Sequence, residues 1–461
     1  EPGRPEEYPE ERWFIVALVA SAYVVWTMCK VNMSVAILPM TQEYGWDPSQ
    51  VGLVQSALFW GYAVSQVPGG FFATRFGGKP TLLAAALLWS AATVAAPSAA
   101  AESVEALVAS RALVGLGEGL APPAGARIIA TWVPEQERSR AVAALGSGSK
   151  LGNIAGLLAA PPIIAASGWP AVFLAFGGLG LLWAGAWAVL GRDREPCGPE
   201  LCAVGEEGGA AGASEGPVPW ARILSSPPVW GVFAAHFCNN WGMFGLLTWL
   251  PTYLNRELGY DLQGSALLTT VPSVFGIACA ALAGSLADGL RSDGWALTDV
   301  RKACQATAFG VPGLCLGALG LVGPSVAGEG SPLPVVLLVL AVGGSSFSYA
   351  GLYSSHVDLS AKYAGLVNGM STAVGAVAGS LSNLYCGSAL AGSASWAQAL
   401  FGPSVAFYAV GLVAYLSLYD ASPLDWDAEG PDDLRTPSPP PARSALADAA
   451  AAPPPPPPPP P

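Results

Sequence analysis

Apolar blocks of roughly 20 residues follow one another along most of this 461-residue chain. Such a block is long enough to cross the hydrocarbon core of a bilayer as an α-helix. The sequence lacks the alternating segments of about ten residues that a membrane β-barrel needs. It therefore predicts an all-α membrane protein with twelve transmembrane helices. The predicted spans are 13–40, 51–74, 80–97, 104–128, 141–166, 169–190, 228–254, 263–287, 303–323, 332–355, 363–390 and 399–419.

Composition excludes several other classes of protein. Hydrophobic residues make up 52% of the chain and charged residues 11%, whereas a soluble domain carries about 25% charged residues. The net charge of −12, with only 20 Lys and Arg, removes the basic surface that nucleic acid requires. No nucleophile and base are spaced as in an enzyme. We expect a lipid bilayer as partner, no nucleic acid and no enzymatic activity.

The loop cations predict an orientation. Apart from those in the tails and spans, every Lys and Arg except Arg256 follows an even-numbered span: Arg75, Lys79, Arg127, Arg138, Arg140, Arg192, Arg194, Arg222, Arg291, Arg301, Lys302 and Lys362. Cytoplasmic loops are enriched in such cations. The pattern predicts that both ends of the chain lie on one cytoplasm-like face.

Two similar motifs suggest an internal repeat. Gly70, Thr74, Arg75 and Lys79 follow the second predicted span, and Gly284, Asp288, Arg291, Arg301 and Lys302 follow the eighth. Six spans separate them, as in two parallel six-helix repeats; ordinary loop composition is the alternative. We expect an acidic tail (1–12), a six-helix half (13–190), a central loop (191–227), a second six-helix half (228–419) and a disordered Pro-rich tail (420–461).

A family resemblance rests on many separated motifs. They include VNMSVAILPM (31–40), EYGW (43–46), FWGY (59–62), Arg111 with Glu118-Gly119, WVPEQERSR (132–140), HFCNNWG (236–242) and YSSHVD (353–358). Over residues 12–419 the chain resembles the major facilitator superfamily. Within it, the chain is most similar to solute carrier 17-type anion transporters, especially plant and algal phosphate transporters of plastids and other organelles. The resemblance implies transport of phosphate, glutamate, sialic acid or ascorbate.

Lys30 is the first candidate substrate ligand. It lies deep in an apolar span, where an unpaired cation costs at least about 2.5 kcal/mol. A snorkelling lysine is the alternative, but Lys30 is far from the interface near Trp13. A midplane cation suits an anionic substrate, and the resemblance places a substrate-contacting Arg or Lys here. An ammonium suits a compact tetrahedral anion at least as well as a carboxylate.

Arg111 and Glu118 are candidates for a coupling network. They stand seven residues apart in the fourth span, so they share one helix face. They can neutralise each other, or Glu118 can carry a coupling proton. The resemblance implies the second role. Tyr62, Asn239 and Asn240 are candidate hydrogen-bond partners of the substrate. Lys150 either faces the substrate as well or pairs with Glu118.

Some positions depart from the family pattern. Cys29 stands where relatives usually carry aspartate, which favours drive by membrane potential or sodium over protons; Na⁺ and H⁺ both stay open as coupling ions. Asn239 replaces an arginine of glutamate carriers, which argues against dicarboxylates. Thr74 replaces the usual aspartate of its motif, and Thr372 replaces a frequent asparagine.

The two histidines predict no metal site. His236 lies in the seventh span, and His356 precedes Asp358 by two residues. A zinc site needs more nitrogen or sulfur ligands. We expect His356 and Asp358 to join a charge network or to form a polar cluster that fixes a helix end. The eight cysteines are scattered through the spans except Cys197 and Cys202, and they imply no disulfide framework.

The tails suggest accessory roles. The acidic start of the sequence is unlike a transit peptide, and an upstream targeting segment is a possibility that the sequence leaves open. The polyproline run 453–461 offers a site for a proline-reading partner. We expect a plastid or other organelle membrane, or otherwise the plasma membrane.

The sequence therefore leads to three functional hypotheses. The first is a secondary active transporter that moves inorganic phosphate or a similar small anion, with no cofactor beyond a coupling ion. The second is an organic-anion transporter of the glutamate, sialate or ascorbate type. The third is a non-transporting membrane receptor or scaffold, which has no use for Lys30.

Overall fold

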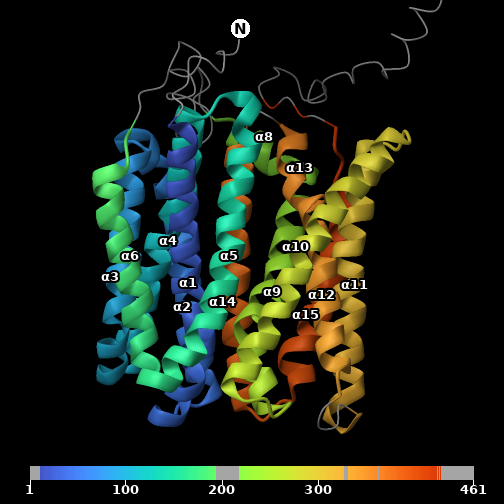
Figure 1. Ribbon diagram of the computed structural model, residues 1–461. Helices are drawn as coiled ribbons and strands as arrows, with labels where there is room; N and C mark the ends of the chain where they lie inside the picture. Colours follow the sequence, from blue (N-terminus) through green and yellow to red (C-terminus); the bar gives the residue numbers. More distant parts are fainter. Residues whose placement is uncertain are drawn as a thin grey trace, which may run out of the picture.

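The computed structural model describes residues 11–193, 218–326, 331–360, 363–422, 424 and 426, and long α-helices dominate this part of the chain (Figure 1). The helical elements are α1 (Arg12–Tyr44), α2 (Pro48–Phe76), α3 (Gly78–Glu102), α4 (Val104–Trp132), α5 (Glu135–Ser167), α6 (Trp169–Leu190), α8 (Trp220–Ser225), α9 (Pro227–Arg256), α10 (Leu262–Ser292), α11 (Leu297–Val326), α12 (Leu333–Ser345), η2 (Ser346–Tyr349), α13 (Leu352–Leu359), α14 (Ala364–Ala391), η3 (Ala397–Phe401) and α15 (Gly402–Leu418). Cys197, Cys202, Lys362 and the polyproline run lie outside the described residues.

Local sequence signals explain where helices begin and end. Gly45 ends α1 at φ +66°, a left-handed conformation that glycine adopts without steric cost. Asp47 then caps α2. Its side chain accepts from Gln50 N at 2.9 Å, and Gln50 Oε1 accepts from Asp47 N at 3.0 Å, which is a complete capping box. The chain thus turns within three residues between two membrane-length helices.

The first nine predicted spans each fall within one helix of the described chain, and the all-α fold class is confirmed. The last three agree less closely: 332–355 runs over α12, η2 and α13, 363–390 begins one residue before α14, and 399–419 runs over η3 and α15 and ends one residue after α15. Nine of the described helical segments are long and apolar enough to cross a membrane. Three more helices are as long as these nine segments: α2, α4 and α9 have 29, 29 and 30 residues. They contain polar side chains such as Gln55, Glu118 and Asn239, which lower their mean hydropathy. These side chains are buried, as polar groups at membrane depth usually are.

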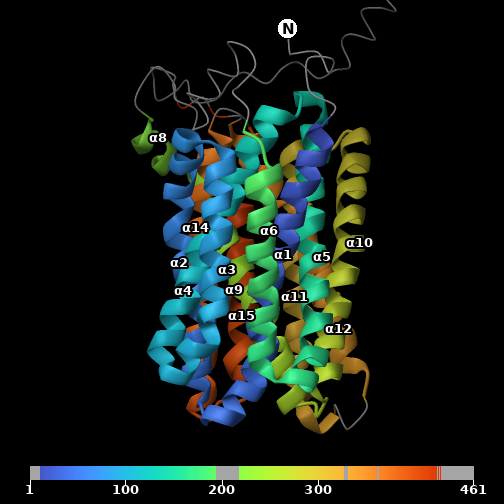
Figure 2. The ribbon, with the colours of Figure 1, turned by 60° about the vertical axis from the view of Figure 1, so that its left-hand side comes forward.

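The helices form two groups, α1–α6 and α9–α15 (Figure 1). Within the first group, α1 packs on α5 and α6, and α4 packs on α2 and α3. In the second, α9 packs on α14 and α15, and α11 packs on α12 and α15. The groups meet where α2 contacts α14 and where α5 contacts α10. Figure 2 shows α1 beside α5, with α3 and α6 on the outer side of the first group.

The two groups approach most closely where α2 begins and α14 ends. A Cβ added to Gly52 would lie 2.6 Å from Asn383 O and 2.9 Å from Gly387 Cα. Only glycine allows the two backbones to approach this closely. Gln55 Nε2 donates to Thr248 O at 3.4 Å one turn further along α2. The backbones of α2 and α14 are therefore in direct contact at this end of the interface between the groups.

The opposite end carries the beginning of α1, the end of α6 and helix α8 (Figure 1). Arg192, after α6, forms an ion pair with Glu11 at 2.7 Å. Arg222 of α8 donates to Trp426 O at 3.2 Å. The segment after α15 therefore returns to the same end as the start of α1, which is the end where the sequence analysis places the loop cations.

Candidate functional site

Four aromatic rings surround the ammonium of Lys30. Its Nζ lies 4.8 Å from the ring centroid of Tyr62, 5.6 Å from that of Phe244 and 5.8 Å from those of Trp26 and Phe59. The rings come from α1, α2 and α9, so both helix groups contribute. Aromatic faces attract a cation within about 6 Å. This environment holds Lys30 in the interior instead of letting it reach toward an interface.

Lys30 forms an ion pair with Glu118. Its Nζ lies 3.7 Å from Glu118 Oε2; the Glu118 side chain is fully buried, and that of Lys30 is 16% exposed. Neither carboxylate oxygen of Glu118 accepts a hydrogen bond among the described residues. Lys150 lies elsewhere, with Nζ 5.4 Å from the ring centroid of Tyr349. The structure therefore does not contain the ion pair between Lys150 and Glu118 that the sequence offered as one alternative.

Arg111 has hydrogen-bond donors without a partner in the described chain. Its side chain is buried, and its only hydrogen bond in the described part of the chain runs from one terminal nitrogen to Lys30 O at 3.4 Å. Nε and the other terminal nitrogen have no partner there. A buried guanidinium without partners carries a large desolvation cost. An anion at this position would satisfy both the charge and the free donors.

A small cavity connects Lys30 with Arg111. Its lining residues come from α1, α2, α4 and α9: Lys30, Val31, Ser34, Gln55, Leu58, Phe59, Arg111, Leu247 and Thr248. Two cations, the buried Arg111 and the largely buried Lys30, therefore border one cavity at the contact between the helix groups. Asn32, which is not part of this lining, is fully buried, and its side-chain amide has no hydrogen-bond partner in the described chain.

The predicted asparagines lie in a separate polar chain of the second group. Asn239 Nδ2 donates to Asn240 Oδ1 at 3.2 Å, and Asn239 Oδ1 accepts from Ser348 Oγ at 3.1 Å. Gln305 continues the chain, because its Nε2 donates to Ser348 Oγ at 3.5 Å. Hydrogen bonds within the protein thus link α9, η2 and α11, and they fix the orientation of the Asn239 amide.

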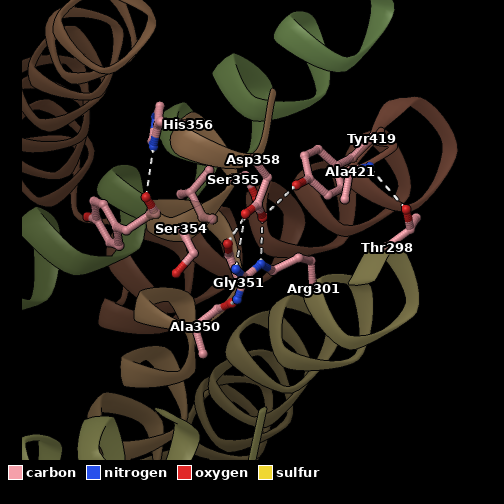
Figure 3. A network of polar contacts seen from close by, with 12 residues as sticks. Thr298, Arg301, Ala350, Gly351, Ser354, Ser355, His356, Asp358, Tyr419 and Ala421 are labelled. Atoms are coloured by element: carbon pink, nitrogen blue, oxygen red, sulfur yellow. Dashed lines mark hydrogen bonds and ion pairs between the residues drawn. The ribbon is translucent and has the colours of Figure 1, made fainter. Parts of the chain in front are cut away.

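Asp358 and His356 point in different directions (Figure 3). Arg301 binds the Asp358 carboxylate through two nitrogens, at 2.6 and 3.2 Å, and Tyr419 OH donates to it at 3.2 Å. His356 instead places Nδ1 3.1 Å from Tyr353 O. Residues two apart on a helix do not share a face. Asp358 therefore fixes the end of α13 to α11 and to the residue after α15, without His356.

The two loop motifs differ in their surroundings. In the first, Thr74 Oγ1 donates to Gly70 O at 3.0 Å, Lys79 O accepts from Trp187 Nε1 at 3.1 Å, and Arg75 is exposed. In the second, Asp288 is exposed, Lys302 is partly exposed, and a Cβ on Gly284 would meet open space. Arg301 connects this second motif with Asp358. The motif and the charge network, which the sequence treats as separate, thus share one ion pair.

Several residues around Lys30 were not among the candidates predicted from the sequence. Trp26 stands one helical turn before Lys30, and Phe59 stands three residues before Tyr62, so helical spacing could have identified both. Gln55, Phe244 and Thr248 carry no such signal, because only the contact between α2 and α9 brings them to the cavity. No group of three or more His, Cys, Asp or Glu in the described chain could hold a metal ion.

Comparison with known proteins agrees with this architecture. Residues 15–383 match the family model of the Major Facilitator Superfamily. The chain is 41% identical over 414 residues to the "Sodium-dependent phosphate transport protein 1, chloroplastic" of Arabidopsis thaliana, covering 89% of this chain and 79% of the relative. It is 40% identical over 415 residues to the "Probable anion transporter 4, chloroplastic" of Oryza sativa subsp. japonica, covering 89% and 68%.

A third curated relative and two solved structures extend the comparison. The "Ascorbate transporter, chloroplastic" of Arabidopsis thaliana is 39% identical over 414 residues, covering 89% of this chain and 75% of the relative. An inward-facing bacterial homologue of the lysosomal transporter Spinster has the same fold, with a TM-score of 0.70 at 16% identity, covering 90% of this chain and 98% of that one. A D-xylose–proton symporter gives 0.68 at 16% identity, covering 88% and 97%.

These matches confirm the predicted family and the multi-pass membrane architecture. They also agree with the prediction that the protein is a transporter and not an enzyme. The chain belongs to the Major Facilitator Superfamily.

Proposed function

We propose that the protein is a secondary active transporter that moves inorganic phosphate or a similar small anion across a plastid membrane. The observation that carries the proposal is the cavity that Lys30 and Arg111 border. Two largely buried cations at one cavity need a counter-charge, and Glu118 supplies one negative charge for both. An anion of one charge completes the balance.

The relatives support this substrate class. One is named for sodium-dependent phosphate transport and another for ascorbate transport, and both are chloroplastic. Phosphate and ascorbate share a compact shape and a negative charge at neutral pH. A site with one ammonium and one guanidinium, bordered by neutral donors such as Ser34 and Gln55, suits either anion better than a long dicarboxylate.

The proposed mechanism is alternating access. The two predicted halves, 13–190 and 228–419, rock about a site at their contact, as in other transporters built from repeats. Lys30 pairs with Glu118 at 3.7 Å. An incoming anion competes with Glu118 for Lys30 and takes up the free donors of Arg111. Glu118, once released, is then free to bind the coupling ion, which links the anion to H⁺ or Na⁺.

The remaining predicted residues take supporting roles in this proposal. Tyr62 holds Lys30 through its ring, and Asn239 with Asn240 belongs to the polar chain of the second half, outside the cavity lining. The Arg301–Asp358 ion pair holds the ends of α11 and α13 together and so stabilises the second half as one rigid body during rocking, while Gly70, Thr74, Arg75 and Lys79 act at the corresponding end of the first half.

An organic-anion transporter is the second candidate. Lys150 is half-buried and has its ammonium over the Tyr349 ring, so a larger anion that reaches from Lys30 toward α5 would meet a third cation. In this second candidate function the substrate is ascorbate or a carboxylate of similar size. A receptor or scaffold without a substrate would have no use for these cations.

Uptake into proteoliposomes tests the proposal. Purified protein is reconstituted, and the uptake of labelled phosphate is measured with a sodium gradient, with a proton gradient and with neither. Saturable uptake above that of protein-free liposomes supports phosphate transport. If labelled ascorbate is taken up and phosphate neither enters nor competes, the organic-anion function replaces it. If neither anion enters under any gradient, the proposed function is wrong.

A further inference from the structure

We propose that His236 and His356 form a proton-binding site in the second helix group, and that this site loads its proton together with the transported anion. The inference rests on the proposed function, since it assigns a coupling ion to that transporter. It concerns residues that the anion site around Lys30 does not use.

The only two histidines of the sequence meet in the folded chain. His236 lies on α9 and His356 on α13, 120 residues apart, yet their ring centroids are 6.0 Å apart with an interplanar angle of 63°. Both side chains are buried, each residue being 2% exposed. Histidine is the side chain whose charge changes most readily near neutral pH. A buried pair of this kind is a candidate proton site.

Hydrogen bonding defines which nitrogen of His356 is free. Nδ1 lies 3.1 Å from Tyr353 O, and a backbone carbonyl can only accept, so Nδ1 carries the hydrogen. A neutral imidazole protonated at Nδ1 presents Nε2 as an acceptor. His356 Nε2 is buried and has no hydrogen-bond partner among the described residues. The ring therefore offers one buried lone pair to a proton.

His236 is held firmly, with its ring centroid 6.0 Å from that of His356. Its Nδ1 forms a short hydrogen bond with Ser371 Oγ on α14. A Cβ on Gly375 would lie 2.9 Å from His236 Cδ2, so the absence of a side chain there lets α14 pack on the ring. Two imidazolium ions so close together in a buried site would repel each other strongly. The pair therefore binds one proton, not two.

The neighbours of the pair offer no free carboxylate. Asp358 lies two residues beyond His356, but Arg301 and Tyr419 occupy its oxygens. On α13 and η2 the neighbouring titratable groups are Tyr353, whose ring centroid is 5.3 Å from that of His236, and Tyr349, which stacks on Tyr353.

The other packed helices bring cations or neutral groups. α14 contains no charged residue. α15 contributes Tyr415, whose hydroxyl bonds Ser355. Lys150 of α5 lies over Tyr349, and α1, which contacts α9, carries Lys30. Lys30 already has Glu118 as its partner and Arg301 has Asp358. A proton on the pair therefore adds a positive charge without a carboxylate of its own, and an anion bound between the helix groups is the counter-charge.

Reciprocal coupling follows from this arrangement. If the anion makes protonation of the pair more favourable, the proton must strengthen anion binding by the same factor. Anion and proton then cross together. In the sequence, Cys29 stands where relatives carry an aspartate, which favours a step driven by membrane potential or sodium over one driven by protons. In the folded chain the histidine pair can take the role of that missing carboxylate and bind the proton.

The first experiment measures proton-driven uptake. Proteoliposomes are loaded without sodium and clamped at zero voltage, and labelled phosphate uptake is compared with and without an inward proton gradient. Wild-type protein and the exposed-residue control Arg256→Gln should both be stimulated by the gradient. His356→Gln and His236→Gln should lose the stimulation but keep phosphate–phosphate counterflow, which moves no net proton. Full stimulation in both variants would overturn the inference.

A second experiment follows the protonation of the two histidines by NMR in the wild-type protein, so it needs neither transport nor a folded variant. Wild-type protein with histidine-selective ¹³C and ¹⁵N labels and a tag free of histidine gives imidazole signals from two residues only. One signal should change with pH as the pair takes up its proton, and phosphate or ascorbate should shift that titration to higher pH. If neither ring titrates with or without the anions, the histidine inference is wrong, even where uptake shows that the proposed function is right.

Discussion

Lys30 Nζ and Glu118 Oε2 lie 3.7 Å apart, and this contact joins α1 to α4 beside the cavity between the helix groups. Both partners are largely withdrawn from solvent. A buried ion pair of this kind adds little net stability, but removing one partner is costly. Its exchange for a pair between Lys30 and a substrate anion is the central step of the proposed transport cycle.

Replacement of Lys30 tests that step directly. We expect Lys30→Ala to abolish uptake, because the variant removes the ammonium that faces the cavity. Lys30→Arg keeps the charge and should retain part of the activity, although the guanidinium fits the four rings differently. Arg256→Ala, at an exposed position, is the control. Near-normal uptake by well-expressed Lys30→Ala would remove Lys30 from the site.

Glu118→Gln removes the internal competitor of the anion. We expect tighter phosphate binding, by about tenfold as for a typical coupling energy, together with slower net uptake. The reason is that Lys30 has no partner to return to when the substrate leaves. Equilibrium binding of labelled phosphate and initial uptake rates measure the two effects. Glu105→Gln, exposed on the same helix, serves as control, and weaker phosphate binding by Glu118→Gln would contradict the competition.

Local sequence patterns predict the helices well and the side-chain partners poorly. The predicted spans coincide with helices because each depends on its own run of apolar residues. Asp358, by contrast, pairs with Arg301, 57 residues earlier in the chain, and not with the nearby His356. The aromatic set around Lys30 includes Phe244 of the second group. Only helix packing creates these contacts, and no spacing in a single sequence specifies it.

Gly52 should control closure of the interface between α2 and α14. In Gly52→Val the new side chain would collide with Asn383 O and Gly387 Cα and force the helices apart. Cys386, fully buried beside this contact, should then react faster with a membrane-impermeant maleimide, as measured by mass spectrometry of the labelled peptide. Gly178→Val, where the added Cβ meets open space, should leave the labelling rate unchanged. Equal rates in both variants would contradict this closure.

The Arg12–Glu137 contact predicts a pH-dependent contribution to stability. A hydrogen bond from Arg12, at 2.8 Å, lowers the pKa of Glu137 below its ordinary value of 4.5. A carboxylate whose pKa is depressed by folding contributes stability above its unfolded pKa and loses it as the pH falls through the folded value. Glu137→Gln should therefore lower the melting temperature slightly at pH 7 and less at pH 4. An equal loss at both values would exclude the ion pair as the cause.

Replacement of Lys150 distinguishes the two candidate substrate classes, phosphate-like anions and organic anions. It lies over Tyr349, away from Glu118, so a compact anion held by Lys30 and Arg111 has no need of it. We expect Lys150→Gln to leave the apparent affinity for phosphate within about twofold, since a distant charge contributes little to it. The same variant should weaken competition by malate or glutamate about tenfold or more, the scale of a lost charged hydrogen bond. Competition of each anion against labelled phosphate, in wild type, Lys150→Gln and Lys150→Arg, measures both effects. If malate competes better than arsenate in the wild type and Lys150→Gln reverses that order, the cavity is an organic-anion site with Lys150 as its second clamp.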